Sequence, residues 1–318
     1  MSVVREPLQE VLSKLPHPPE GKACWPWTIV DDYRDDLIAA ADGLPKISVV
    51  TPSLNQAEFL EETIRSVILQ GYPRSEYIVI DGGSTDGSID ILERYSAHIN
   101  YWVSEPDEGQ TQALNKGFAR ANGEWQMWLN SDDVLLPGAL HRLAATIRNN
   151  PNADWIVGNV VVTDENLQPK RTFEPVCNTD DWTDFLCNKR KTGTSIPQPG
   201  SCWSRNAWLE AGKLDETLRY VMDFEYWVRL ARKGYRPLLL PEDLALFRLT
   251  STSKSGGGMA KFISEEKVVV AKYLREKQLE EPLRVFLYRF FLQPTWLYRI
   301  ACNKMKNLFL GISPRAKK

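Results

Sequence analysis

Two adjacent carboxylates, Asp132 and Asp133, directly follow an apolar run that ends at Leu129, and Pro137 then opens a helical pattern. We interpret the run as a buried strand that delivers both carboxylates to its C-terminal end. Ligands bind at that end of the strands in open α/β sheets. Two carboxylates there suit a hard divalent cation shared with a phosphate group, whereas Asp in front of a helix also serves as a simple cap. The pair alone leaves both interpretations open.

A second carboxylate pair, Asp223 and Glu225, stands at the start of a predicted helix, with Tyr226 and Trp227 beside it. The helix dipole favours an ionised carboxylate at this end. Such a carboxylate next to a sugar hydroxyl can act as a general base. Ordinary placement of negative charge at a helix start explains the pattern equally well.

Strands and helices alternate in the first half of the chain. The apolar patterns predict strands at 47–51, 77–80, 99–103 and 124–129, and helices at 56–69, 88–95 and 109–120. This alternation predicts an α/β fold with a doubly wound, mainly parallel sheet, in which the turns after the strands face one crevice. Residues 51–55, 81–86, 104–110 and 130–133 should then converge.

The second half is less regular. We expect strands at 154–162, 171–173, 238–240 and 244–247, and helices at 178–187, 205–211, 222–234, 262–274 and 283–310. Residues 1–45 should form an extended arm, with Trp25 and Trp27 packing onto the main domain. The expected domain covers residues 46–250. A mobile loop and C-terminal helices follow at 251–318.

Composition excludes several classes of protein. The chain has 318 residues, 43% hydrophobic and 25% charged, as in soluble globular proteins, and its net charge of -2 gives no general attraction for nucleic acid. Five cysteines without a CxxC pair indicate neither a zinc site nor a disulfide framework. With no signal peptide and no run of about 18 apolar residues, we expect a cytoplasmic protein. The glycine-rich turn at 82–87 is neither a dinucleotide fingerprint nor a P-loop.

Four motifs follow one another in a recognisable order: ISVVTPSLNQ at 47–56, IDGGSTDG at 80–87, SEPDEGQ at 104–110 and LNSDD at 129–133. MDFEYW at 222–227 comes after them. In these motifs the chain resembles a family 2 glycosyltransferase with the GT-A fold, a Rossmann-like mainly parallel sheet flanked by helices. The resemblance covers about residues 46–250 and implies a catalytic domain with a nucleotide-binding half at 46–135 and an acceptor half at 136–250.

The resemblance implies an inverting transfer of a sugar from a nucleoside diphosphate sugar to an acceptor hydroxyl. It implies that Asp132 and Asp133 hold Mn²⁺ or Mg²⁺ on the diphosphate and that Asp223 is the catalytic base. The implied nucleotide-sugar site comprises Thr51, Pro52, Asn55, Asp81, Gly82, Gly83, Asp107, Gly109, Asn130 and Asp132. Our acceptor candidates, from the less regular half, are Gln198, Trp203, Glu225 and Trp227.

Three positions depart from the pattern of the family. Many relatives have a second Asp where Gly82 stands, which leaves the nucleobase open. Asn130 replaces the first acid of the DxD signature. Leu249 and Thr250 fill the place of a His that many relatives carry. The third metal ligand or diphosphate contact is therefore either missing or supplied by Arg248, Ser253 or Lys254.

The C-terminal segment combines apolar stripes with many Lys and Arg residues. Such helices lie on an anionic membrane, which suits a lipid-linked acceptor, or pack on the domain; the sequence leaves both open. The acceptor is then a sugar or a lipid-linked sugar, and surface polysaccharide or glycolipid synthesis is the expected process. One alternative is a catalytically inactive protein that binds nucleotide sugars or acts as a membrane scaffold. Another is a sugar nucleotidyltransferase, but the absence of Gly and basic residues at 51–56 disfavours that function.

Overall fold

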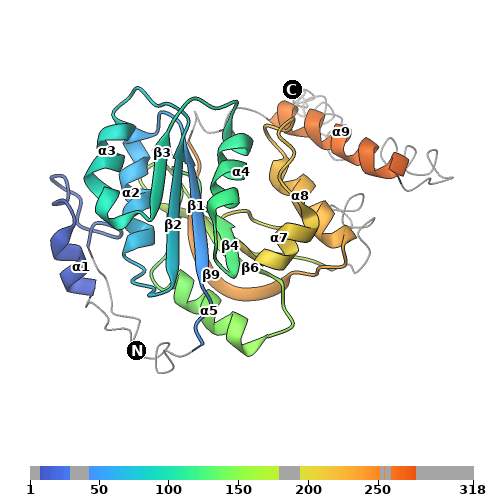
Figure 1. The fold of residues 1–318 in the computed structure, drawn as a ribbon, viewed down its shortest axis with the longest axis horizontal. Coiled ribbons are helices and arrows are strands. Elements are labelled where there is room, and N and C mark those ends of the chain that lie inside the picture. The colour runs from blue at the N-terminus through green and yellow to red at the C-terminus, as the bar shows by residue number, and fades with distance from the viewer. Residues whose placement is uncertain (1–7, 29–42, 179–193, 251–253, 255–258, 277–318) are drawn as a thin grey trace, which may run out of the picture. The chain divides into compact units, whose positions relative to one another are not determined.

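The computed structural model describes residues 8–28, 43–178, 194–250, 254 and 259–276 (Figure 1). The chain divides into two compact units, Met1–Glu266 and Lys267–Lys318. The sheet and the candidate site belong to the first unit. Helix α9 (Met259–Glu276) begins in the first unit and continues into the second.

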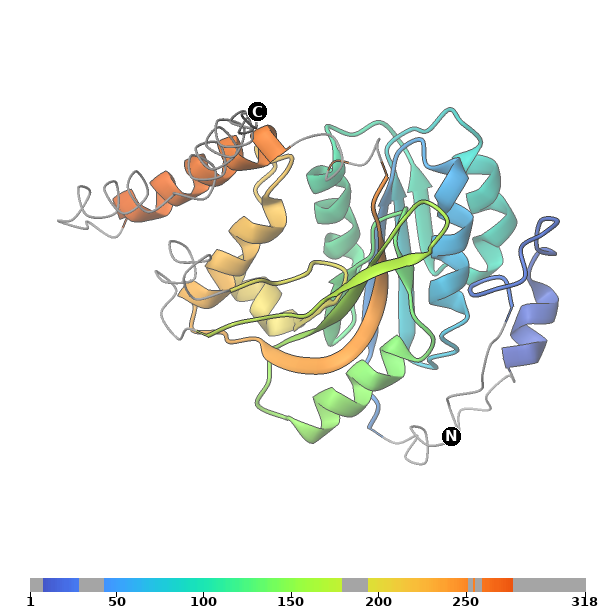
Figure 2. The same cartoon turned by 180° about the vertical axis from the view of Figure 1, so that it is seen from behind.

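The core of the first unit is a nine-stranded sheet with the order β3-β2-β1-β4-β8-β6-β9-β5, in which β7 pairs with β6. Strands β1 (Ile47–Ser53), β2 (Ser75–Asp81), β3 (Tyr101–Ser104) and β4 (Trp125–Trp128) are mutually parallel. Helices α2 (Ala57–Ile68) and α3 (Ser88–Tyr95) cover one face, and α4 (Gln110–Arg120) covers the other (Figures 1 and 2). The predicted doubly wound α/β half is confirmed. Because both faces are covered, every residue of β1 is buried.

The other half of the sheet is mixed. It contains β5 (Val134–Leu135), β6 (Trp155–Thr163), β7 (Pro169–Phe173), β8 (Ser201–Ser204) and β9 (Leu238–Arg248). Only β6 and β9 pair in parallel among the described strands here. The two strands predicted at 238–240 and 244–247 are one strand, and register shifts opposite residues 158–160 accommodate the polar stretch between them. Strands β5 and β8 were not predicted, because each is too short to show a periodic pattern.

The helices of this half are α5 (Ala139–Asn149), α7 (Arg205–Ala211) and α8 (Met222–Arg232). These and α9 agree with the predicted helices. The predicted helix at 178–187 lies outside the described residues except for its first position, and the helix at 283–310 and its basic stripes lie outside them entirely. Within the described part of the chain, no helix combines the length and apolarity needed to span a bilayer.

The N-terminal arm differs from the extended segment we expected, because it begins with helix α1 (Leu8–Lys14). Leu8 and Leu15 are buried, and Val11 and Leu12 pack at the helical spacing between them. The predicted packing of both arm tryptophans is confirmed. Trp25 is 8% exposed and Trp27 is 3% exposed.

Candidate active site

The carboxyl ends of β1 to β4 meet at one edge of the sheet. The Gly82 amide donates to Ser53 O over 2.8 Å and joins the turns after β1 and β2. Ser104 Oγ donates to Asp81 Oδ2 over 2.7 Å and joins the turns after β2 and β3. Gln110 Nε2 reaches the turn after β4 over 2.7 Å. The predicted convergence of the four turns is therefore confirmed.

Asp81 holds its turn together from inside. Its carboxylate is fully buried and accepts hydrogen bonds from the amides of Gly83 (3.1 Å) and Ser84 (2.8 Å) and from the hydroxyls of Ser84 (2.6 Å) and Ser104 (2.7 Å). A buried carboxylate needs such donors to offset its desolvation. Asp81 thus determines the conformation of the glycine-rich turn. We expect it to affect nucleotide binding through this conformation and not by direct contact.

Asn55 connects the first two turns. It adopts a left-handed conformation with φ 51°, which Asn tolerates better than most residues. Its amide donates to Ser84 Oγ over 2.7 Å, and its Oδ1 accepts from the Thr85 amide over 2.9 Å. Thr51 and Pro52 are buried behind it, whereas Asn55 is exposed.

Gly82 leaves room for Asp107. A Cβ atom at Gly82 would lie 2.9 Å from Asp107 Oδ2, so the second acid found here in many relatives would collide with that carboxylate. Asp107 Oδ1 accepts from the Gly109 amide over 2.8 Å. Burial raises the pKa of the half-buried Asp107. Asp107 therefore places a carboxyl group where the missing acid would project.

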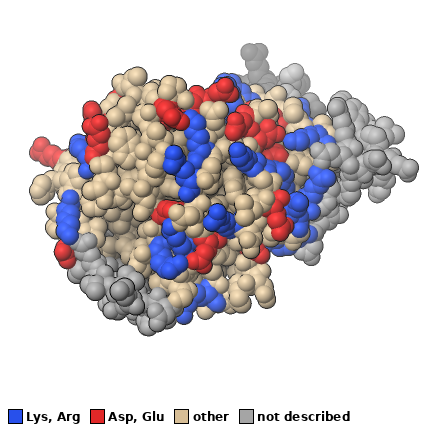
Figure 3. Space-filling model, viewed as in Figure 1, with Lys and Arg blue, Asp and Glu red and all other residues tan. Residues whose placement is uncertain are grey.

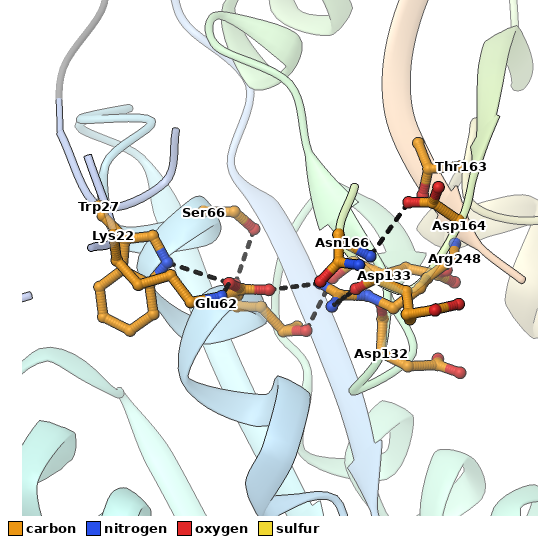
Figure 4. Close-up of polar contacts among 12 residues, drawn as sticks. Lys22, Trp27, Glu62, Ser66, Asp132, Asp133, Thr163, Asp164, Asn166 and Arg248 are labelled. Atoms are coloured by element: carbon orange, nitrogen blue, oxygen red, sulfur yellow. Dashed lines mark hydrogen bonds and ion pairs between the residues drawn. The ribbon is translucent and has the colours of Figure 1, made fainter. Parts of the chain in front are cut away.

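The carboxylates of Asp132 and Asp133 have different surroundings (Figure 4). Asp133 is completely buried, and its Oδ1 and Oδ2 accept from the Arg248 amide and Asn130 Nδ2, each over 3.0 Å. Burial raises the pKa of Asp133, and the neighbouring charge of Asp132 raises it further. The Asp132 side chain is only partly buried and extends away from Glu62 (Figure 4).

This geometry fits a shared metal site better than a protein cage. The described residues include no group of three or more His, Cys, Asp or Glu side chains that could enclose a cation. Mg²⁺ is commonly held by one or two carboxylates together with substrate phosphates. Asp132 fits that role, whereas the direct metal contact predicted for Asp133 conflicts with its burial and its two hydrogen bonds.

A cavity of about 380 Å³ adjoins the end of β4, and Asp132 and Asp133 are not among the residues that line it. Trp128 and Asn130 at the end of β4 line it, and so does Asp223 in the first turn of α8. Asp223 Oδ1 accepts from the Phe224 amide over 2.7 Å, which fixes the side chain beside the cavity. Aromatic rings supply much of the remaining wall, from Phe173, Tyr220, Phe224, Phe247 and Phe262.

Lys254 lies on the wall of the same cavity. Its Nζ donates to Gln110 Oε1 over 2.7 Å and to Arg219 O over 2.9 Å. The carboxylates of Asp223 and Asp132 are close enough to attract its ammonium group. The position suits an anionic ligand, and its contact with a diphosphate stays a prediction.

The diphosphate contact predicted for Arg248 is wrong. Its side chain is 2% exposed and does not line the cavity. The guanidinium donates to Glu62 Oε2 (2.5 Å), to Asp132 O (2.9 Å) and to Glu165 O (2.7 Å), so its donors face the protein interior. The third candidate, Ser253, is outside the described residues.

Only one of the four acceptor candidates lines the cavity, and that is Gln198. Trp203 and Trp227 are at most 2% exposed and pack with each other, with ring centroids 5.6 Å apart. Glu225 is 1% exposed and pairs with Arg229 over 2.9 Å. These three predictions are wrong, because the side chains belong to the core and cannot reach an acceptor in the cavity.

Two supporting carboxylates were not predicted by the sequence analysis. Glu62, in α2, is buried and binds Arg248. Glu265, in α9, accepts hydrogen bonds from three successive backbone amides just before α8, those of Arg219, Tyr220 and Val221. Both contacts join elements distant in the chain, so no local pattern could reveal them.

Solved structures share this architecture. A mannosyltransferase from Pyrobaculum calidifontis, solved with GDP-Man and Mn²⁺, superposes with a TM-score of 0.58 at 18% identity, over 85% of this chain and 76% of that one. TarS residues 1–349 from S. aureus, solved with UDP, gives a TM-score of 0.55 at 20% identity, over 79% of this chain and 73% of that one. These neighbours establish the fold as GT-A-like.

The family described as glycosyl transferase family 2 matches residues 48–212, more than half of the chain. The chain belongs to this family and is a glycosyltransferase. A putative teichuronic acid biosynthesis glycosyltransferase of Bacillus subtilis is 29% identical over 66% of this chain and 82% of its own length. A PGL/p-HBAD biosynthesis glycosyltransferase of Mycobacterium bovis is 30% identical over 41% of this chain and 52% of its own length.

Proposed function

We propose that the protein transfers a sugar, with inversion, from a nucleoside diphosphate sugar to an acceptor hydroxyl. The observation that carries this proposal is the single cavity lined by Asn130 at the nucleotide edge of the sheet and by Asp223 at the start of α8. A nucleotide sugar bound over the turns that follow β1 to β4 would place its sugar beside the Asp223 carboxylate. The solved complexes of similar fold with UDP and with GDP-Man support a nucleotide-sugar donor.

In the proposed reaction, Asp223 takes the proton from the acceptor hydroxyl while the oxygen attacks the anomeric carbon. The bond from that carbon to the diphosphate breaks, and the diphosphate leaves with the electron pair. Asp132 would hold Mn²⁺ or Mg²⁺, which when bound supplies positive charge beside the leaving diphosphate. Lys254, on the same wall, adds a second positive charge there.

The biological process follows from the relatives. The names of two relatives refer to teichuronic acid and PGL/p-HBAD biosynthesis, and we assign this chain to surface polysaccharide or glycolipid synthesis on that support. We place it in the cytoplasm, where nucleotide sugars are available. The competing scaffold reading requires donor binding without turnover.

Thermal unfolding with UDP, GDP, TDP, CDP and ADP, each with and without Mn²⁺, tests the donor site. At a hundred times its dissociation constant, a bound diphosphate stabilises the folded protein by about 2.7 kcal/mol. We expect one diphosphate to raise the melting temperature only with Mn²⁺. Asp223→Asn should keep this shift and lose turnover by about 10²–10⁴-fold, the typical contribution of a general base. No shift with any diphosphate would contradict the donor assignment, and full turnover by Asp223→Asn would contradict the base.

A further inference from the structure

Helix α2 turns a polar face toward the segment that carries Asp132. Thr63 and Ser66 in α2 and Gln70, two residues past its end, are all fully buried. Thr63 Oγ1 donates to Asp133 O (2.7 Å), Ser66 Oγ accepts from the Leu135 amide (3.1 Å), and Gln70 Nε2 donates to Leu136 O (3.0 Å). Burying polar side chains is unfavourable unless they are hydrogen-bonded, and here the partners are backbone groups of three residues that follow β4. The helix therefore fixes the path of residues 133–136.

Glu62, on the same helix, extends this contact to Asp132 itself through Arg248. The Arg248 guanidinium bridges Glu62 Oε2 and Asp132 O, and the Arg248 amide donates to Asp133 Oδ1. Both partners of this ion pair are buried, with side chains 6% and 2% exposed. A buried carboxylate that is paired with a cation is held in a defined geometry by charge-assisted hydrogen bonds.

The N-terminal arm completes the arrangement from the other side (Figure 4). Lys22 Nζ and Trp27 Nε1 both donate to Glu62 Oε1, over 2.8 and 3.0 Å. Trp25 Nε1 donates to Leu135 O over 2.7 Å. Figure 4 shows Glu62 between Lys22 and Trp27 on one side and Arg248 on the other. A part of the chain that precedes the first strand is thereby connected to Asp132 by three hydrogen bonds in series: from the arm to Glu62, from Arg248 to Glu62, and from Arg248 to Asp132 O.

We infer that residues 22–27 of the arm are a positioning element of the active site: through Glu62 and Arg248 they hold the Asp132 carboxylate in the geometry that binds the metal-bridged diphosphate. This inference rests on the proposed role of Asp132. None of Lys22, Trp27 and Glu62 lines the cavity. Their effect on catalysis must pass through the backbone of residues 132–135.

The chain offers a matched control for the loss of Lys22. Lys46 pairs with the buried Glu76 over 3.0 Å, as Lys22 pairs with the buried Glu62 over 2.8 Å. Glu76 lies in the first part of β2, at the end of the strand opposite the crevice. Lys22→Met and Lys46→Met thus each remove one partly exposed ammonium group from a buried carboxylate. Of the two carboxylates, only Glu62 is linked to Asp132 through Arg248.

The first measurement is backbone hydrogen exchange of the full chain without ligand, in Lys22→Met, Trp27→Phe and Lys46→Met. We expect the amides of Asp133 and Leu135 to exchange at least about threefold faster in the first two variants and at the wild-type rate in Lys46→Met. Trp27→Phe keeps an aromatic ring beside Arg65 while removing the donor to Glu62. Wild-type exchange of these amides in both arm variants overturns the inference.

The second measurement is calorimetric titration of UDP and GDP in the presence of Mn²⁺. Residues that orient a metal ligand typically change metal affinity by about 10–100-fold when altered, and we expect that loss in Lys22→Met and Trp27→Phe. Lys46→Met should bind as wild type does. Wild-type binding in the two arm variants contradicts the positioning role even when exchange is faster.

Asp132→Asn separates this inference from the proposed function. If Asp132→Asn still binds the diphosphate with Mn²⁺ as wild type does, the proposed metal role of Asp132 fails, and the positioning role fails with it. If Asp132→Asn abolishes binding while the arm variants bind normally, only the positioning role is overturned. Loss of binding in Asp132→Asn and in both arm variants supports both proposals.

Discussion

At the scale of single residues, the neighbouring carboxylates of Asp132 and Asp133 have the same chemistry but different surroundings, from which we predict different roles. Asp133 accepts one bond on each oxygen inside the protein, whereas Asp132 extends from the same turn with its carboxylate directed away from Glu62 (Figure 4). Burial without solvent access suits a residue that builds the turn. Partial exposure suits a residue that meets a ligand.

Substituting each of the two with Asn should therefore give opposite results. In Asp133→Asn, the new side-chain amide group faces either the Arg248 amide or Asn130 Nδ2, so that one of these two donors loses its acceptor. The unfolding free energy should therefore fall by about 1–3 kcal/mol. Asp132→Asn should unfold as wild type does but lose the Mn²⁺-dependent stabilisation by diphosphate. Chemical denaturation and thermal shift measure the two effects. The reverse pattern would mean that the assignments of the two carboxylates must be exchanged.

Glu62 should make stability depend on pH. Burial raises its pKa, but hydrogen bonds from Lys22, Arg248 and Trp27 outweigh this, and the pKa lies below the ordinary 4.5. A lowered folded pKa means that the stabilisation is fully present above about pH 4.5 and is lost as the pH falls through the folded value. Glu62→Gln should thus be less stable than wild type at pH 7, and the difference should shrink on acidification in denaturation curves. A constant difference from pH 7 to 3 would show that the carboxylate charge is not involved.

Sequence reasoning could select Asp223 and Asp132 as candidates because their spacing after apolar runs and at a helix start is local. It could not find the role of Glu62. The polar positions 62, 63, 66 and 70 follow helical spacing, and such a stripe ordinarily indicates a solvated face. Here the arm and the turn after β4 cover that face, so its polar groups bind protein instead of water.

At the scale of elements, α9 supports the helix that carries Asp223. Two residues before Asp223, the backbone amides of residues 219–221 point at the Glu265 carboxylate, over distances from 2.7 to 3.2 Å. These amides precede the first turn of α8, whose carbonyls do not accept from them, and a carboxylate at the N-terminal end of a helix is favourable. Glu265 thus anchors the start of α8 from a different helix.

Glu265→Ala should leave these amides without their acceptor and allow Asp223 to move. A displacement of about 1 Å at a reacting group can lower a rate by about a hundredfold, so we expect kcat to fall about 10–100-fold. Glu265→Gln retains one carbonyl acceptor and should fall between Ala and wild type. Steady-state kinetics and diphosphate binding check this together. Equal kcat in Glu265→Ala and wild type would contradict the anchoring role.

The elements that the sequence failed to predict have a common physical reason. Strand β5 has two residues and β8 has four, and each exists because a neighbouring strand supplies its hydrogen bonds. Strand formation there depends on tertiary pairing and not on local propensity. By contrast, α2, α4, β1 and β2 are long and periodic enough to be predicted almost to their ends.

At the scale of the molecule, the two halves of the sheet share an aromatic core. Trp128 comes from β4, Trp155 from β6, Trp203 from β8 and Trp227 from α8. Trp227 lies 6.0 Å from Trp128, 5.1 Å from Trp155 and 5.6 Å from Trp203, measured between ring centroids. The helix carrying Asp223 is therefore packed on the same strands that position the nucleotide crevice. Loss of this core should weaken both halves together.

Trp203→Ala tests whether the two halves of the sheet unfold together. It also tests whether Trp203 belongs to the core and does not contact a ligand in the cavity. Removing a buried Trp side chain typically costs about 3–5 kcal/mol, and Trp203 is completely buried. We expect a single, coincident unfolding transition at lower denaturant when near-UV and far-UV circular dichroism are compared, because the halves share one core. Well below the transition, affinity for the diphosphate with Mn²⁺ should equal that of wild type, since Trp203 does not line the cavity. Two separate transitions would show that the halves fold independently, and weakened ligand binding by fully folded protein would show that the tryptophan reaches the site after all.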